Sequence, residues 1–210
     1  MMNFWFSGCA LFGGLSALGM GIYVYVKNRK APINRIYSLL SLTLCSRTMH
    51  GTAAFIPALY LHFIFTLLNL PKDKVKKKQT ISYIISFILL SFIPTPLFIN
   101  NMIPKFIFNW YSQKGPVYPP FTIYFFIYII YAMWILFKEL TTSSGHKRLQ
   151  LKYILLASVI GFGGGATTFP LVYDISIPPF GILLFAFYPL IIAYAIVTYR
   201  LLDITVVITR

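Results

Sequence analysis

The stretch Tyr188–Arg210, YPLIIAYAIVTYRLLDITVVITR, is the part of the chain from which its architecture is most readily interpreted. An apolar run from Pro189 to Val197 ends at Tyr199 and Arg200. An aspartate, Asp203, follows before a run rich in β-branched residues. An uncharged run that ends on an aromatic and a basic residue is typical of a membrane helix reaching the headgroup layer. The pattern therefore predicts a membrane helix that leads into water at Tyr199.

The composition of the whole chain is that of an integral membrane protein. Of its 210 residues, 58% are hydrophobic and only 10% are charged, whereas roughly 25% are charged in an ordinary soluble domain. The formal net charge of +14 comes from 18 basic and 4 acidic residues. The basic residues lie in short loops between apolar runs, so they indicate topology and contacts with anionic lipid headgroups and do not indicate a nucleic-acid surface.

The apolar runs predict an all-α fold, a polytopic membrane helix bundle with six to seven transmembrane helices. A span needs about 20 predominantly apolar residues. Five runs meet or approach this length: Phe4–Val26, Gln79–Ile99, Phe121–Phe137, Tyr153–Val172 and Gly181–Thr198. The 35 residues of Ile36–Leu70 are too many for one span and barely enough for two. Two short crossings with a turn at Ser46–Gly51, or one long bent helix, are the alternatives.

The distribution of lysine and arginine predicts the orientation. The loops after the first run, at Lys72–Lys78, at Lys138–Lys152 and after the last run hold 4, 5, 4 and 2 of these residues, and the other side holds 2. The positive-inside rule then places the N-terminus outside and the C-terminus in the cytoplasm of a multi-pass cell-membrane protein. This orientation requires Ile36–Leu70 to cross an even number of times, which favours two crossings over one bent helix.

Small residues recur at helical spacing in two of the runs. Gly13, Ala17 and Gly21 share one face of the first run, and Gly161 and Gly165 form a GxxxG pair in a later one. Such spacings let a neighbouring helix approach closely, so both sets are predicted packing positions. For the first run, the general frequency of glycine in membrane helices is an equally good explanation.

The segment Asn100–Pro120 is expected to be a long loop, because it combines proline with many aromatic residues and carries only Lys105 and Lys114. Interfacial aromatic residues often form a belt at the headgroup level, which is the favoured interpretation here. A lid over a ligand is the alternative. The aromatic residues concerned are Phe106, Phe108, Trp110, Tyr111 and Tyr118.

Two groups of residues resemble the seven-helix sensor region at the N-termini of many bacterial membrane histidine kinases. The first is the exit run, namely Pro189, Ala193 to Ile196, Tyr199 to Leu201, Asp203 and Ile204. The second is Arg47, His50, Phe55, Ile56, Pro57, His62 and Phe63. The resemblance implies a sensor bundle in residues 1–199 and the start of a cytoplasmic linker in residues 200–210. It also implies a fuller second helix, so we expect this chain to have lost a piece near Cys45.

Ionisable residues within a membrane bundle are candidate functional residues. The ligand or sensing candidates are Arg47, His50, His62 and Asp174. His62 either bonds the carbonyl group that Pro57 leaves free or contributes to sensing. Arg47 and His50 are interfacial anchors or polar ligand contacts, and Asp174 is a solvated loop acid or an outer ligand contact.

The expected function is that of a membrane input module, and the resemblance implies the N-terminal region of a two-component sensor histidine kinase. A small-molecule or membrane-borne signal would pass through the last helix to a cytoplasmic output domain or response regulator, and a homodimer is one assembly open to it. The predicted signal-exit residues are Tyr199, Arg200 and Asp203.

The sequence predicts no enzymatic activity for this chain. It contains neither a G-x-S-x-G nor an H-E-x-x-H motif, and no kinase core. Cys9 and Cys45 lack ligand spacing, so no metal or cofactor is expected. A small transporter or permease-like subunit is an alternative, although the helices offer no acidic residue for ion coupling and no internal repeat. A stand-alone membrane scaffold is a third interpretation.

Overall fold

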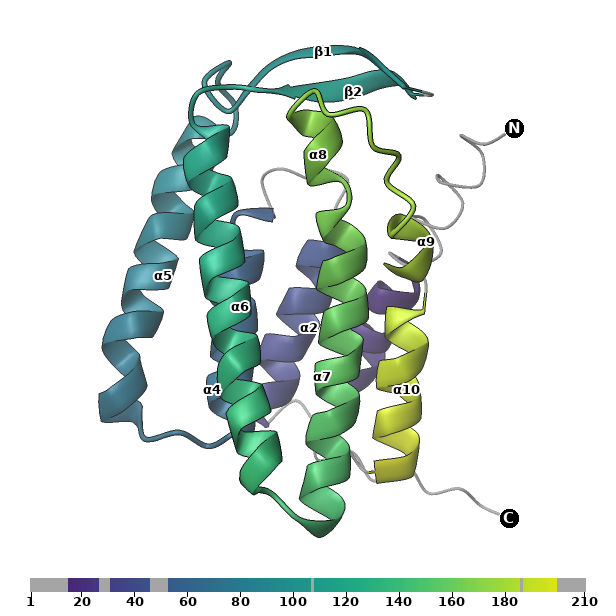
Figure 1. Cartoon of the computed structure of the whole chain (residues 1–210). Coiled ribbons are helices and arrows are strands. Elements are labelled where there is room, and N and C mark those ends of the chain that lie inside the picture. Colours follow the sequence, from purple (N-terminus) through teal and green to yellow (C-terminus); the bar gives the residue numbers. More distant parts are fainter. Residues whose placement is uncertain (1–14, 27–30, 46–52, 107, 186, 200–210) are drawn as a thin grey trace.

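The computed structural model describes residues 15–26, 31–45, 53–106, 108–185 and 187–199. Most of these residues form helices that lie side by side as rods (Figure 1). The helices are Leu15–Val26, α2 (Pro32–Cys45), α4 (Ile56–Leu67), α5 (Lys72–Phe92), α6 (Tyr118–Thr142), α7 (Gly145–Ala166), α8 (Phe169–Val172), α9 (Ile182–Phe185) and α10 (Tyr188–Tyr199). α8 continues the direction of α7, and α10 that of α9. With these pairs taken as single rods, the chain reverses direction from each described rod to the next.

The all-α prediction needs one correction, because part of the predicted loop Asn100–Pro120 is a β-hairpin. β1 (Ile99–Lys105) pairs antiparallel with β2 (Phe108–Lys114), from Ile99 opposite Lys114 to Lys105 opposite Phe108. We call these two strands the hairpin. It lies across one end of the bundle, next to α8 (Figure 1). Pairing the strands satisfies backbone groups in a segment that proline keeps out of a helix.

The segment Ile36–Leu70 holds two separate antiparallel helices. The ring of Tyr37 on α2 lies 5.9 Å from that of Phe63, late in α4. One turn further along α2, Leu40 lines the same cavity as Ile56, the first residue of α4. The alternative of a single bent helix is therefore wrong, and the segment forms two helices. The predicted turn at Ser46–Gly51 lies outside the described residues.

The fourth predicted helix is displaced toward the N-terminus. α5 begins at Lys72 rather than Gln79, so the lysines expected in a loop form its first two turns. It ends at Phe92, seven residues before the predicted Ile99. Pro94 and Pro96 follow directly, and proline cannot continue the helical hydrogen-bond ladder.

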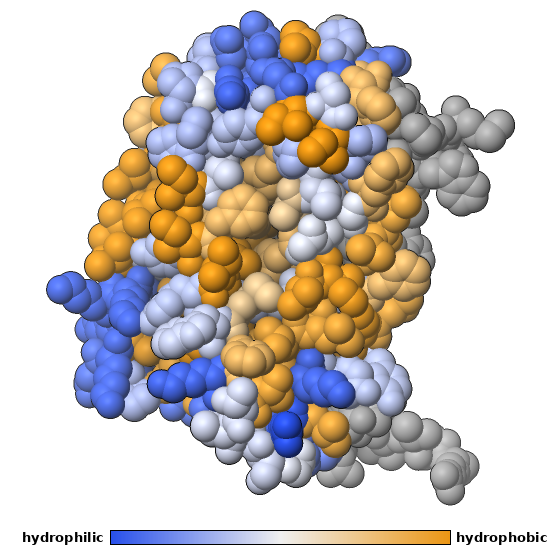
Figure 2. Space-filling model, in the orientation of Figure 1, coloured by the Kyte–Doolittle hydropathy of each residue, from blue (hydrophilic) through white to orange (hydrophobic). Residues whose placement is uncertain are grey.

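The side chains on the visible face form an apolar band between two hydrophilic ends (Figure 2). α6 shows the reason, because it is apolar on both sides. It exposes Ile123, Ile127, Ile130, Trp134 and Phe137 while burying Phe121, Phe125, Ile129, Ala132 and Leu136. A helix that is hydrophobic all round is typical of a membrane span. Among the described residues, Tyr118–Thr142 and Gly145–Val172 are long and apolar enough to cross a membrane.

The two ends of the bundle differ in charge. The end opposite the hairpin, which we call the basic end, carries Arg35, Lys72, Lys74, Lys76, Lys77, Lys78, Lys138, Lys147, Arg148 and Lys152. At the hairpin end, the described residues include only Lys105 and Lys114 as basic side chains. This difference agrees with the predicted division of the loops into a lysine- and arginine-rich set on one side and a set with only two basic residues on the other.

Hydroxyl groups join α5 and α6 to each other and α5 to the residues just before α4, inside the apolar bundle. The Oγ atom of Ser86 lies 2.8 Å from the backbone oxygen of Ala54 and 2.8 Å from the hydroxyl oxygen of Tyr124. The Tyr124 hydroxyl is also 3.1 Å from the backbone oxygen of Ser82. Hydrogen bonds between helices of this kind stabilise membrane bundles, because the surrounding lipid offers polar groups no partner.

We expect Tyr124→Phe to lower the free energy of unfolding by about 0.6 kcal/mol, the average for such a bond in a membrane bundle, and by no more than about 1.7 kcal/mol, the largest value found. The measurement is thermal or denaturant unfolding in detergent. Tyr128→Phe is the matched control, because no hydrogen bond joins its hydroxyl group to another described residue. Equal losses in the two variants would show that the Tyr124 network contributes nothing specific.

Candidate functional site

A cavity of about 280 Å³ lies between α2, α4, α6, α7, α9 and α10. Its wall is mostly apolar and contains many aromatic rings, among them Tyr60, Phe63, Tyr118, Phe121, Phe125 and Tyr188. Concave, largely apolar sites between the helices of a bundle are common ligand sites. The cavity is therefore the first candidate for a functional site.

One short chain of hydrogen bonds interrupts this apolar wall. The Tyr60 hydroxyl donates to Oγ of Ser158 at 2.7 Å, and that Oγ donates to the backbone oxygen of Ile154 at 2.8 Å. Tyr60 and Ser158 both line the cavity, and their exposed fractions are 2% and 4%. The chain ties α4 to α7 and places a phenol oxygen in the wall.

The last helix contributes directly to the cavity. Tyr188 and Ile192 of α10 line it. Gly161 of α7 packs against Tyr188, because a Cβ atom added at Gly161 would lie only 3.1 Å from Cδ2 of the tyrosine ring. The predicted packing position Gly161 is thus where α7 and α10 approach closely.

The other predicted packing position, Gly165, faces open space in this chain, and its packing role stays a prediction. A Cβ atom added at Gly165 would meet no atom within 4 Å, and the residue lines the cavity. The sequence did not single out Gly181, where an added Cβ would lie 2.6 Å from Thr167. Spacing alone does not show which glycine faces a helix and which faces a void.

The small-residue face of the first helix is only partly described. Ala17 is fully buried, and Gly21 is buried beside α2, where its carbonyl oxygen accepts a hydrogen bond from Oγ of Ser38 at 2.7 Å. Gly13 lies outside the described residues. The close contact at Gly21 is the kind of approach that small residues permit.

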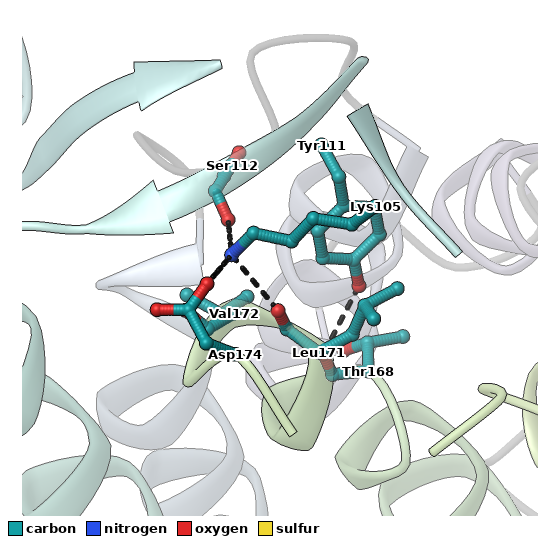
Figure 3. A network of polar contacts seen from close by, with 7 residues as sticks. All are labelled: Lys105, Tyr111, Ser112, Thr168, Leu171, Val172 and Asp174. Atoms are coloured by element: carbon teal, nitrogen blue, oxygen red, sulfur yellow. Dashed lines mark hydrogen bonds and ion pairs between the residues drawn. The ribbon is translucent and has the colours of Figure 1, made fainter. Parts of the chain in front are cut away.

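A second polar cluster fixes the hairpin to α8 (Figure 3). The Nζ atom of Lys105 lies 2.8 Å from Oδ1 of Asp174 and donates to the backbone oxygens of Ser112, Leu171 and Val172 at 3.2, 3.0 and 3.3 Å. Only 6% of its side chain is exposed. A lysine near the last carbonyl groups of a helix also interacts favourably with the helix dipole. The sequence offered no signal that this lysine is buried.

Asp174 is half exposed and takes a left-handed backbone conformation with φ of 63°. The hydrogen bond from Lys105, together with the positive charges of Lys105 and Lys114, lowers the pKa of this carboxyl group. The candidate ligand residue is therefore held in an ion pair. Its role as a ligand contact stays a prediction.

This lowered pKa sets the expected pH dependence. A carboxyl group whose pKa is lower in the folded state adds stability above its unfolded pKa of about 3.9, and that stability is lost as the pH falls through the folded value. We expect Asp174→Asn to lower the melting temperature at neutral pH and the gap to wild type to close below about pH 4. A gap independent of pH would contradict the ion pair.

Two of the predicted belt residues point inward instead. The hydroxyl of Tyr111 donates to the backbone oxygen of Thr168 at 3.0 Å, and Tyr118 is 4% exposed. Phe106 is 52% exposed and left-handed, with φ of 54°. The belt prediction is therefore wrong for Tyr111, which bonds to the bundle from β2, and for Tyr118, which begins α6 and packs against Phe98 and Phe169.

His62 joins two helices. Its Nδ1 atom lies 2.9 Å from the hydroxyl oxygen of Tyr83 on α5, and the two rings meet edge to face. Among the described residues, its hydrogen-bond partner is this tyrosine and not the carbonyl group that Pro57 leaves free. His62 does not line the cavity. A sensing role for it stays a prediction.

Several predicted residues fall outside the description. They are Arg47, His50, Arg200 and Asp203. Tyr199 is the last residue of α10. Of the ligand candidates, the structure therefore describes only His62 and Asp174, and it places them in two separate networks. The cavity residues were missed because their burial around a common void has no signature in the sequence.

The fold and composition together define a helical membrane protein. Residues 38–205 match the family model of the N-terminal 7TM region of histidine kinase. The chain belongs to this family, so the resemblance noted in the sequence is confirmed. This region is a non-catalytic input region of the kinase. No curated protein and no solved structure matches the chain.

Proposed function

We propose that this chain is the multi-pass sensor input module of a membrane histidine kinase. The family match over residues 38–205 carries the proposal, because a region at that place in a kinase supplies the input to the catalytic part. The apolar band between two hydrophilic ends supports it, since a bundle of this kind fits a bilayer. Residues 1–199 form the sensor bundle, and residues 200–210 begin the linker to a cytoplasmic output domain.

The charge difference between the ends supports one orientation in the cell membrane. Basic residues favour the cytoplasmic side, so the basic end and the C-terminus of α10 face the cytoplasm, and the hairpin faces outward. All seven rods in the described part of the chain cross the bilayer in this arrangement. The lysines at the start of α5 lie where anionic headgroups would meet them, each contributing about 1 kcal/mol near a charged surface.

Signal transmission through α10 follows from its position. This helix contributes Tyr188 and Ile192 to the cavity and ends at Tyr199, directly before the linker. A ligand shifts a conformational equilibrium only if it binds one arrangement better than another. A ligand in the cavity touches α10 itself, so its binding would move the helix that carries Tyr199, Arg200 and Asp203 toward the output domain or a response regulator.

The orientation is tested by cysteine labelling in cells. In a background without Cys9 and Cys45, we expect a membrane-impermeant maleimide to label Lys114→Cys in intact cells. It should label Lys76→Cys only after the membrane is permeabilised. Both side chains are exposed at opposite ends of the bundle. The reverse labelling pattern, or equal labelling of both sites in intact cells, would contradict the proposed orientation.

The sensor function is tested with the catalytic region of a histidine kinase fused after Arg210. In proteoliposomes, an organic extract of cells and spent medium should change autophosphorylation of the fusion and leave the isolated catalytic region unaffected. Autophosphorylation that responds to neither organic nor aqueous extracts would contradict the function. A solute flux coupled to an ion gradient in proteoliposomes would also contradict the sensor function, because it would indicate a transporter.

A further inference from the structure

We propose that the cavity binds a small lipophilic molecule that carries a hydrogen-bond donor for the Tyr60 oxygen. This inference deepens the proposed sensor function and rests on it, because it names the chemical class of the signal. Three features of the cavity lead to it: its volume, the mostly apolar chemistry of its wall and the hydrogen bonding of one hydroxyl group in that wall, that of Tyr60.

The volume sets the size of the molecule. An apolar cavity of about 150 Å³ in another protein holds benzene. The cavity here measures about 280 Å³, so by proportion it accommodates roughly ten non-hydrogen atoms. Aromatic rings from α4, α6 and α10 line it, which suits a flat or compact apolar body.

The polar group in the wall sets the chemistry of the ligand's functional group. Ser158 gives its proton to the backbone oxygen of Ile154, so the bond between Ser158 and Tyr60 must use the proton of Tyr60. No described residue donates a hydrogen bond to the oxygen of Tyr60 in return. This buried phenol oxygen therefore offers only lone pairs, and a ligand meets it best with an O–H or N–H donor.

A matched pair of probes tests this chemistry on the full chain in lipid nanodiscs. 1-Naphthol and 1-methylnaphthalene have the same number of non-hydrogen atoms, but only 1-naphthol has a donor. We expect saturable binding above that of empty nanodiscs, with 1-naphthol bound roughly three- to tenfold more tightly, as one neutral hydrogen bond predicts. Tyr60→Phe should remove this preference and retain binding of 1-methylnaphthalene.

A second pair of variants tests the location. A side chain at Gly165 enters open space in the cavity wall, so Gly165→Leu should fill part of the void and abolish saturable binding of both probes. Gly163 is exposed and also meets no atom within 4 Å, so Gly163→Leu is the control and should bind as wild type. Circular dichroism and gel filtration establish that both variants fold.

Three outcomes would overturn the proposal: no saturable binding to wild type, equal affinity for the two probes, or undiminished binding to a folded Gly165→Leu variant. None of these outcomes contradicts the proposed orientation or the sensor function, because the labelling and kinase-fusion experiments do not use the two probes. Conversely, a fusion that does not respond to any extract would contradict the sensor function, but the binding data would still show whether the cavity binds the two probes.

Discussion

Lys105→Met lowers the free energy of unfolding by about 2–4 kcal/mol, because it removes the charged donor that three buried backbone acceptors share, and hydrogen bonds from a charged group are stronger than neutral ones. The acceptors are the carbonyl groups of Ser112, Leu171 and Val172, in residues that are 8% exposed or less. Methionine retains much of the length of lysine and loses the ammonium group. Unfolding of the purified protein in detergent, followed by circular dichroism, measures the loss.

The matched control for this variant is Lys114→Met in the same hairpin. Lys114 is exposed, and its Nζ atom lies 4.6 Å from the centre of the Tyr173 ring. A cation–π contact at an exposed site contributes about 0.5–1 kcal/mol, so this variant should lose less. If the two variants lose equal stability, the buried contacts of Lys105 do not hold the hairpin in place.

Gly161→Leu should displace α10 and make autophosphorylation of the kinase fusion insensitive to the extract. The added side chain meets the ring of Tyr188, which a single Cβ atom would already approach to 3.1 Å. Overpacking in a close-packed interior costs about 1–3 kcal/mol, and moving the neighbouring helix relieves it. The measurement compares the extract-dependent change in phosphorylation between the variant and wild-type fusions in proteoliposomes.

Gly163→Leu serves as the control because it adds the same side chain to the exposed side of α7. Its fusion should respond to the extract as wild type does. A Gly161→Leu fusion that keeps the full response would show that the contact between α7 and Tyr188 plays no part in transmission. The unfolding temperature of each fusion is measured alongside.

Much of the helical architecture could be predicted because apolar runs of this length have few other stable solutions. The described part of the exit run, Tyr188–Tyr199, is helical, and the runs after Phe121 and Tyr153 correspond to α6 and α7. Boundaries were less accurate. The helical start of α5 was missed because a lysine-rich stretch resembles a solvated loop, although lysine is a good helix former.

The contacts at the hairpin end could not be predicted in the same way. A lone lysine in a loop is normally solvated, and the burial of Lys105 depends on β2 and α8 meeting it from distant parts of the chain. The cavity is equally non-local, since Tyr60 and Ser158 are 98 residues apart in sequence. The pattern of a single sequence indicates which face of a helix is buried, but it does not indicate which distant segment packs against that face.

The last rod is broken into α9 and α10, and such a break would let the final helix tilt as a unit. α9 ends at Phe185, and α10 begins at Tyr188 with Pro189 as its second residue. Proline donates no backbone hydrogen bond across such a break. The 12 residues of α10 then form an arm about 18 Å long at 1.5 Å per residue, and a tilt of about 10° at the break would carry its far end roughly 3 Å sideways. A sub-ångström shift beside Tyr188 would thus be enlarged several-fold where the chain leaves the bundle.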